Sequence, residues 1–119
     1  FIKNCDIISL NAPLTKETNG LFDKNVFKRV KRGLIIINAA RGEIINEKDL
    51  LESLRSSRIK GAALDVYPEE PLPKNHALRR YVQTHENLIL TPHLGASTEE
   101  AVKNASLFCA ETIAKFFGK

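Results

Sequence analysis

Four short runs of mostly apolar residues constrain what this chain can fold into more than any other feature. They fall at residues 5–10, 34–38, 62–66 and 88–91, and within them apolar residues follow one another instead of alternating with polar ones. Such continuous runs are typical of strands that are buried on both faces, as in parallel sheets. We therefore predict four strands, each covered on both of its faces.

The segments between these runs have the spacing and the end signals of helices. Residues 23–31 carry apolar side chains at helical spacing and are followed by Gly33, a residue type that often ends a helix. A second helix is predicted to begin at Asn46, because Asp49 three residues later forms a variant of the capping box. We expect this helix to end before Gly61.

The last predicted helix begins at Ser97, with Glu100 three residues later completing a capping box. Its apolar face is formed by Ala101, Ala105, Phe108, Cys109, Thr112, Ile113 and Phe116. Residues 67–87 are predicted to be a long loop with one helical turn near 77–82. Strands separated by crossover segments predict an α/β fold with a parallel sheet and right-handed connections, in which ligands bind beyond the carboxyl ends of the strands.

Charge and cysteine content exclude several classes of protein. The net charge is +4, and basic residues cluster at 28–32 and 55–60 without interleaved aromatic residues that could stack on bases. We therefore interpret these clusters as solvated helix faces and expect no nucleic-acid partner. No apolar stretch approaches the roughly 20 residues of a membrane span. Cys5 and Cys109 lack partners at metal-ligand spacing, so we expect no metal site, no disulfide framework and a cytoplasmic location.

Two charged residues lie within or just beyond predicted strands. Arg41 follows the run 34–38 among small residues, and its guanidinium could bind a substrate carboxylate or form a surface ion pair. Asp65 lies inside an apolar strand, where a carboxylate needs hydrogen-bond donors. It could accept a hydrogen bond from a ligand amide or cap a neighbouring loop, and the residues alone favour neither reading.

His93 lies at the end of the fourth run, just before a predicted helix, where an imidazole could act as a general acid or base or serve a structural role. Glu70 follows the third strand, whereas His76 and His85 lie in the long loop and are expected to be solvated. If Arg41, Glu70 and His93 converge, they suit the reduction of a 2-keto acid, in which the arginine binds the carboxylate and the histidine donates a proton.

These segments resemble the NAD-dependent D-isomer-specific 2-hydroxyacid dehydrogenases. The similar stretches are SLNAPLT at 9–15, INAARG at 37–42, GAALDVY at 61–67, EEP at 69–71 and TPHLGA at 91–96. They span nearly the whole chain in the order that the family has. The resemblance implies a Rossmann-type fold, an NAD cofactor, a small 2-hydroxy or 2-keto acid substrate and a parent protein that is a homo-oligomer, either a dimer or a tetramer.

The resemblance also implies roles for individual residues. Arg41 would bind the substrate carboxylate and carbonyl, His93 would be the acid/base and Glu70 its carboxylate partner. The implied cofactor-binding residues are Pro13 beside the adenosine, Ala39, Ala40, Arg41, Asp65 at the carboxamide, and His93, Gly95 and Ala96 near the nicotinamide.

The chain departs from the family in ways that bear on its extent. It lacks the Gly-x-Gly-x-x-Gly turn that binds the phosphates and the acidic residue that hydrogen-bonds the ribose hydroxyl. Asn11 also replaces a histidine that is common in the family. It also contains no methionine. We therefore expect residues 1–119 to be the second half of a Rossmann-type NAD-binding domain, with the substrate domain absent, and the isolated piece to be inactive.

The segment STEEA at 97–101 is most similar to the branch of the family that oxidises 3-phosphoglycerate. The first functional hypothesis is therefore the NAD-dependent conversion of 3-phosphoglycerate to 3-phosphohydroxypyruvate, which opens serine synthesis. Another D-2-hydroxyacid dehydrogenase, such as a glyoxylate or hydroxypyruvate reductase, is the enzymic alternative. A dinucleotide-sensing transcriptional corepressor is the alternative from a different class.

Overall fold

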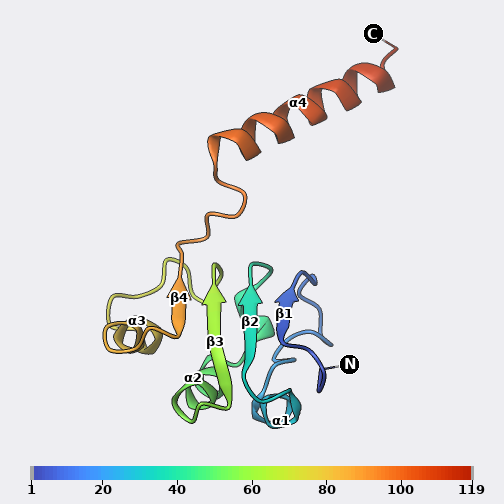
Figure 1. Ribbon diagram of the computed structural model, residues 1–119. Helices are drawn as coiled ribbons and strands as arrows, with labels where there is room; N and C mark the ends of the chain where they lie inside the picture. The colour runs from blue at the N-terminus through green and yellow to red at the C-terminus, as the bar shows by residue number, and fades with distance from the viewer. Residues whose placement is uncertain (1, 119) are drawn as a thin grey trace.

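A parallel sheet of four strands is the centre of the computed structural model, which describes residues 2–118. Its strands are β1 (Ile7–Leu10), β2 (Leu34–Asn38), β3 (Ile59–Leu64) and β4 (Leu88–Leu90), and they lie side by side in the order of the sequence (Figure 1). The predicted α/β fold with a parallel sheet is thereby confirmed. The predicted strand 34–38 agrees with β2 to the residue.

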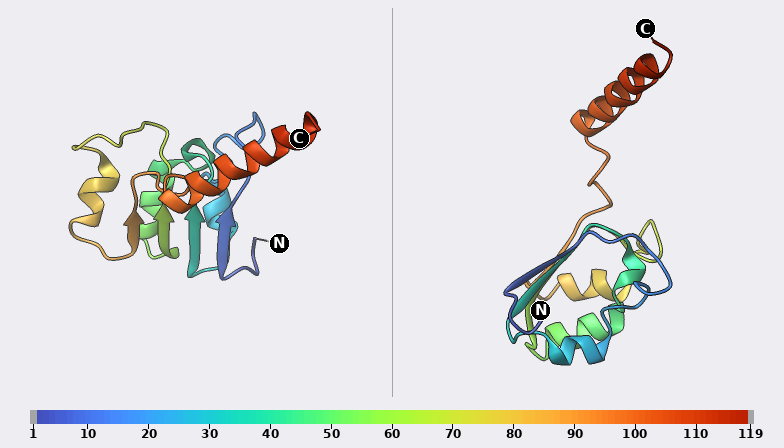
Figure 2. Two further views of the ribbon diagram at one scale, coloured as in Figure 1. Left: turned by 90° about the horizontal axis from the view of Figure 1, so that it is seen from above. Right: turned by 90° about the vertical axis from the view of Figure 1, so that its right-hand side faces the viewer.

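Three helices, α1 (Lys24–Arg29), α2 (Glu47–Arg55) and α3 (Ala77–Val82), cover one face of this sheet (Figure 2). Each connects two neighbouring strands, and each step along the sheet runs in the same direction. Right-handed connections that all step in one direction place their helices on the same face. The core therefore lies between this face and α1 to α3, where Leu34, Ile36 and Ile59 are almost completely buried.

The prediction that both faces of the sheet are covered is wrong. Ile7 and Ile89 point away from the helices, and 59% and 62% of their surfaces are exposed. No element among residues 2–118 lies on that face (Figure 2). A continuous apolar run indicates only that both faces of a strand could be buried. Which face the helices cover depends on the direction in which each connection steps along the sheet.

The ends of the elements follow local hydrogen bonds. As predicted, Asn46 caps α2, and its side chain accepts a hydrogen bond from the Asp49 N–H at 3.1 Å. The helix ends well before Gly61, because the chain turns at Ser57, which has a φ of 53°. β3 then begins three residues before the predicted strand, so that Gly61 lies inside it. The helical turn predicted near 77–82 is confirmed as α3.

The last helix, α4 (Glu99–Phe116), stands away from the sheet, beyond the carboxyl ends of the strands (Figure 1). It begins one residue later than predicted, because the Thr98 side chain, not that of Ser97, accepts the hydrogen bond from the Ala101 N–H. Its predicted apolar face exists but is exposed, with Phe116 83% accessible. Among residues 2–118, no helix is long and apolar enough to cross a membrane.

His76 is not solvated, contrary to the prediction. Its side chain caps α3, where Nδ1 accepts a hydrogen bond from the Leu78 N–H at 3.4 Å. Its Nε2 lies 3.4 Å from Oε2 of Glu47, at the start of α2. Burial raises the pKa of the Glu47 carboxyl, although the nearby His76 opposes this shift. His85, in contrast, is exposed as predicted and stacks on Tyr81.

Arg58, in one of the two basic clusters, has a structural role. Its guanidinium donates hydrogen bonds to the carbonyl oxygens of Phe27 and Lys28, at 3.1 and 2.7 Å, and to that of Val30. These carbonyls lie at the carboxyl end of α1, where helix carbonyls have no partners within the helix. A positive charge is also favourable at this end of a helix.

We predict that Arg58→Ala lowers the free energy of unfolding by about 2 kcal/mol, because three carbonyls lose a charged donor. Arg32→Ala is the control, since Arg32 is exposed, and we expect a change within about 0.5 kcal/mol. Urea denaturation measures both. Equal effects of the two substitutions would contradict the role assigned to Arg58.

Gly42 begins a 3₁₀ turn (Gly42–Ile44) that the sequence did not predict, and it is buried. A Cβ atom at this position would overlap with backbone atoms of Tyr67 and Pro68. Backbone atoms cannot swing aside as the end of a flexible side chain can. The turn after β2 and the loop after β3 can therefore approach this closely only with glycine at position 42.

Gly42→Ala is predicted to lower the free energy of unfolding by about 1–3 kcal/mol, because the 67–68 backbone must move. Gly61→Ala is the matched comparison. There the new Cβ would lie 3.2 Å from the Asn87 carbonyl oxygen, which is tight but short of a severe overlap. Thermal or chemical denaturation that ranks Gly61→Ala as the more damaging change would refute this account.

Candidate active site

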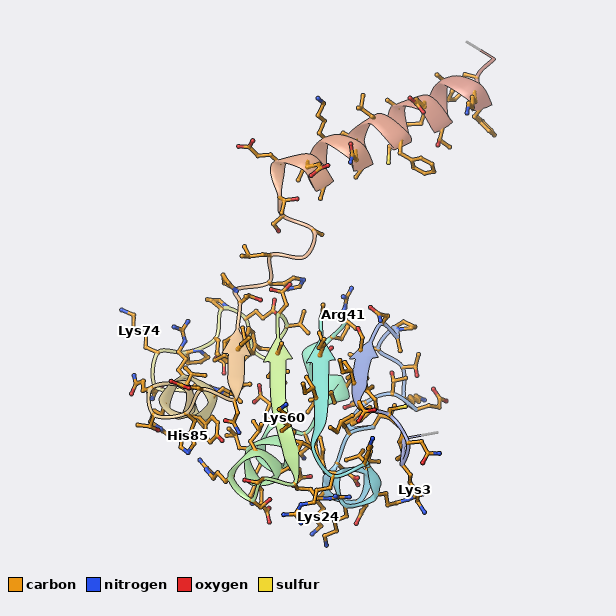
Figure 3. The ribbon with its side chains drawn as sticks, in the orientation of Figure 1. Lys3, Lys24, Arg41, Lys60, Lys74 and His85 are labelled. Atoms are coloured by element: carbon orange, nitrogen blue, oxygen red, sulfur yellow. The ribbon has the colours of Figure 1, made fainter. Side chains whose placement is uncertain are left out.

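Three segments that carry the sequence-predicted residues meet at one edge of the molecule. They follow β2, β3 and β4 and comprise residues 39–41, 65–70 and 91–95. Because the strands are parallel, their carboxyl ends all face this edge (Figure 1). Figure 3 labels Arg41 there, above the end of β2.

His93 and Glu70 form a hydrogen-bonded pair. The distance between Nδ1 of His93 and Oε2 of Glu70 is 2.7 Å, and both side chains are partly exposed. The other carboxylate oxygen, Oε1, accepts a hydrogen bond from the Tyr67 N–H at 2.9 Å. The hydrogen bond with His93, followed by that from Tyr67, holds the pKa of the Glu70 carboxyl below its ordinary value. The pair leaves Nε2 of the imidazole as the ring nitrogen that could exchange a proton with a substrate.

Asp65 caps the segment that contains His93. Its Oδ1 accepts hydrogen bonds from the Thr91 hydroxyl and the Leu94 N–H, and its Oδ2 accepts one from the Gly95 N–H at 2.9 Å. Of the two readings of this residue, the structure therefore shows the loop cap. Partial burial raises the pKa of the Asp65 carboxyl, but these three hydrogen bonds outweigh burial and hold it below its ordinary value.

Arg41 lies apart from this pair. Its guanidinium donates a hydrogen bond to its neighbour, the Ala40 carbonyl, at 2.6 Å, and the side chain is exposed. Among residues 2–118, no hydrogen bond or ion pair joins Arg41 to His93 or Glu70. The buried Asn38 side chain shapes this turn, because it accepts from the Ala40 N–H and donates to the Arg41 carbonyl.

Most of the candidate residues border one of two separate hollows. The larger, of about 720 Å³, is bordered by Glu70 and His93 together with Tyr67, Leu72, Arg79 and Thr91. The smaller, of about 570 Å³, is lined by residues 11–14 and 39–41, which include Pro13, Ala39, Ala40 and Arg41. Gly95 contacts Asp65, while Ala96 is exposed beside it. Within the described residues, no group of three or more His, Cys, Asp and Glu side chains could hold a metal ion.

Three residues that hold this edge together were not among the predicted site residues. They are Asn38, Tyr67 and Thr91. Each is a polar residue at or just beyond the end of an apolar run, which was the available signal in the sequence. The partners of Tyr67 and Thr91 lie up to 26 residues away along the chain, where the sequence pattern does not reveal them. The side-chain partners of Asn38 are only two and three residues away, so its role in the turn was open to a local reading.

The hydrogen bonds to Asp65 and Glu70 predict how stability depends on pH. Since folding lowers both pKa values, these carboxylates stabilise the fold above their ordinary pKa values, near 4, and this stabilisation is lost as the pH falls through the lowered values. We expect the free energy of unfolding to fall between about pH 5 and 2, and to fall less steeply in Asp65→Asn. Glu69→Gln, which removes an exposed carboxylate from the same loop, is measured in parallel. Denaturation series at several pH values measure this, and an unchanged slope in Asp65→Asn would contradict it.

Several known proteins are similar to this chain in sequence and in structure. The NAD binding domain of the D-isomer specific 2-hydroxyacid dehydrogenases matches residues 1–95. The D-3-phosphoglycerate dehydrogenase of Bacillus subtilis (strain 168) is 44% identical over 115 residues, which are 97% of this chain and 21% of that protein. The human D-3-phosphoglycerate dehydrogenase is 46% identical over 113 residues, 95% of this chain and 20% of that protein. The chain thus spans about a fifth of the length of these relatives.

A solved structure extends the similarity to α4. The NADPH-dependent glyoxylate/hydroxypyruvate reductase of Sinorhizobium meliloti, in complex with NADP and sulfate, has a TM-score of 0.85 and 32% sequence identity. The match covers 99% of this chain and 37% of that one. The sequence match over residues 1–95 and the shared fold lead to one conclusion: this chain belongs to the D-isomer specific 2-hydroxyacid dehydrogenase family, whose NAD-binding domain it matches.

Proposed function

We propose that this chain carries the acid/base and the carboxylate-binding groups of an NAD-dependent D-2-hydroxyacid dehydrogenase, and that the protein oxidises 3-phosphoglycerate to 3-phosphohydroxypyruvate. The observation that supports this most is the 2.7 Å hydrogen bond between His93 and Glu70 at the carboxyl edge of the sheet. The 44–46% identity with D-3-phosphoglycerate dehydrogenases supports the choice of substrate.

The residues around the smaller hollow fit part of a dinucleotide. Pro13, Ala39 and Ala40 are small or rigid side chains that would let the cofactor approach the backbone, with Pro13 beside the adenosine. Gly95 and Ala96 would lie near the nicotinamide. Among residues 2–118, Oδ2 of Asp65 accepts one hydrogen bond, from Gly95, and so keeps the capacity to accept another from the carboxamide group. When bound, NAD supplies the acceptor for a hydride.

The chain's own residues then bind the negative charge of the substrate carboxylate and accept the proton of its hydroxyl. Arg41 binds the substrate carboxylate through its guanidinium fork and orients the hydroxyl-bearing carbon. Nε2 of His93 accepts the hydroxyl proton as that carbon becomes a carbonyl. Glu70 accepts the hydrogen bond from Nδ1, and its negative charge stabilises the imidazolium that results.

We further propose that residues 1–119 form part of an NAD-binding domain, and that the cofactor's phosphate turn and a substrate domain are supplied elsewhere in the protein. The absence of a Gly-x-Gly-x-x-Gly turn supports this. The exposed apolar residues of α4 and of the open sheet face support a homo-oligomer. An exposed free thiol at Cys109 is in keeping with a reducing location such as the cytoplasm.

The reduction of glyoxylate or hydroxypyruvate is the second candidate function. The observation that favours it is the similarity to the Sinorhizobium meliloti reductase, which extends over 99% of this chain. A substrate panel separates the two functions. The whole protein should form NADH from D-3-phosphoglycerate with a higher kcat/KM than from D-glycerate or glycolate. Preferred reduction of glyoxylate or hydroxypyruvate with NADPH would instead establish the second candidate.

His93→Ala in the whole protein is predicted to lower kcat by about 10² or more, the usual contribution of a general acid/base. His85→Ala is the matched control, because His85 is exposed and lies in the loop between α3 and β4. It should retain the wild-type rate. Steady-state assays of NADH formation test both variants, and near-normal turnover by His93→Ala would exclude the role proposed for this residue.

A further inference from the structure

The backbone of His93 adopts a conformation that must be held in place. Its φ is 57°, in the left-handed region that residues other than glycine seldom occupy. Such a conformation persists where the surrounding contacts over-determine it. His93 is also exposed and is not packed into a core, so hydrogen bonds have to supply this restraint.

The restraint comes from the two peptide groups that follow His93. The N–H groups of Leu94 and Gly95 each donate a hydrogen bond of 2.9 Å to the Asp65 carboxylate, one to each oxygen. Both amides therefore point back toward the end of β3. A Cβ at position 95 would lie only 3.1 Å from Oδ2 of Asp65, so glycine allows the carboxylate to come close.

Asp65 can hold these amides only if its own side chain is fixed, and Thr91 fixes it. The Thr91 hydroxyl donates a hydrogen bond of 2.5 Å to Oδ1 of Asp65, in the range expected for a hydroxyl on a carboxylate. The backbone of Thr91 is anchored on both sides: its N–H donates to the Leu64 carbonyl, and its carbonyl accepts from the Tyr67 hydroxyl at 2.8 Å.

We propose that Thr91 is a positioning residue for His93, which acts through Asp65 by holding the 93–95 turn. The inference rests on the proposed role of His93 as the acid/base. Thr91 itself makes no hydrogen bond to His93 or Glu70 among the described residues, so its effect passes through the carboxylate. If the 93–95 turn were looser, the imidazole of His93 would occupy its reactive position for only part of the time. Small misplacements of catalytic groups lower the rate of the chemical step.

Two substitutions distinguish the effect of the Thr91 hydroxyl from the effect of the shape of the side chain. Thr91→Val keeps the shape and removes the donor, whereas Thr91→Ser keeps the donor. In the whole protein, we expect Thr91→Val to lower kcat by about tenfold while the substrate KM changes by less than about twofold, and Thr91→Ser to restore kcat to within about twofold. Thr84→Val, which removes a hydroxyl from the loop before β4, should leave both constants unchanged.

Hydrogen–deuterium exchange of the peptide spanning 92–96 supplies a readout that does not depend on turnover. Exchange of the Leu94 and Gly95 amides should be faster in Thr91→Val and at the wild-type rate in Thr91→Ser. Unchanged exchange in Thr91→Val would overturn the proposal whatever the activity. Faster exchange with a wild-type kcat would also overturn it, provided that His93→Ala measured in parallel is inactive. A fully active His93→Ala would instead refute the proposed function, and the exchange rates would still decide whether Thr91 holds the turn.

Discussion

The carboxylate of Asp65 is the interaction on which the carboxyl edge of this molecule depends. A half-buried carboxylate is costly unless donors surround it, and here three donors from residues 91–95 do so. The side chain at the end of β3 thereby replaces the backbone ladder that stops at Leu64 and Leu90. Among the described residues the strand pairing ends here, so the segment with His93 is held by Asp65 together with the hydrogen bonds that Thr91 and His93 make to Tyr67 and Glu70.

A second layer of contacts places Glu70 opposite His93. Tyr67 is buried, and its single hydroxyl proton is shared between the carbonyl oxygens of Leu64 and Thr91, which belong to the two neighbouring strand ends. Its N–H fixes one oxygen of Glu70. Gly42 packs directly against the backbone of residues 67 and 68 and so supports the segment that carries Tyr67. The exposed His93–Glu70 pair therefore rests on buried, hydrogen-bonded groups, and this is how an open edge of a small sheet can present two side chains in a defined geometry.

Local signals in the sequence were sufficient for most of the elements. The run of β2 and the Asn46 cap depend on neighbouring residues, and both were predicted correctly. Ser97 and Thr98 both carry hydroxyls that suit a cap, and only the backbone conformation separates them. The partners of Arg58, His76 and Asp65 lie about 26 to 31 residues away, where periodicity carries no information. The open sheet face depends on the direction of every connection and so on the fold as a whole.

The spacing of the strands sets how far apart the segments that carry Arg41 and His93 begin. β2 and β4 are separated by β3 alone, and neighbouring strands lie about 4.8 Å apart, so the ends of β2 and β4 are about 10 Å apart. The long side chain of Arg41 extends from one side of this interval and the imidazole of His93 from the other. Under the proposed function, a substrate that reaches both groups has to span this interval, above the end of β3. Asp65 lies directly after β3 and its carboxylate binds the segment that carries His93, so this one side chain ties the position of the imidazole to the end of the strand between β2 and β4.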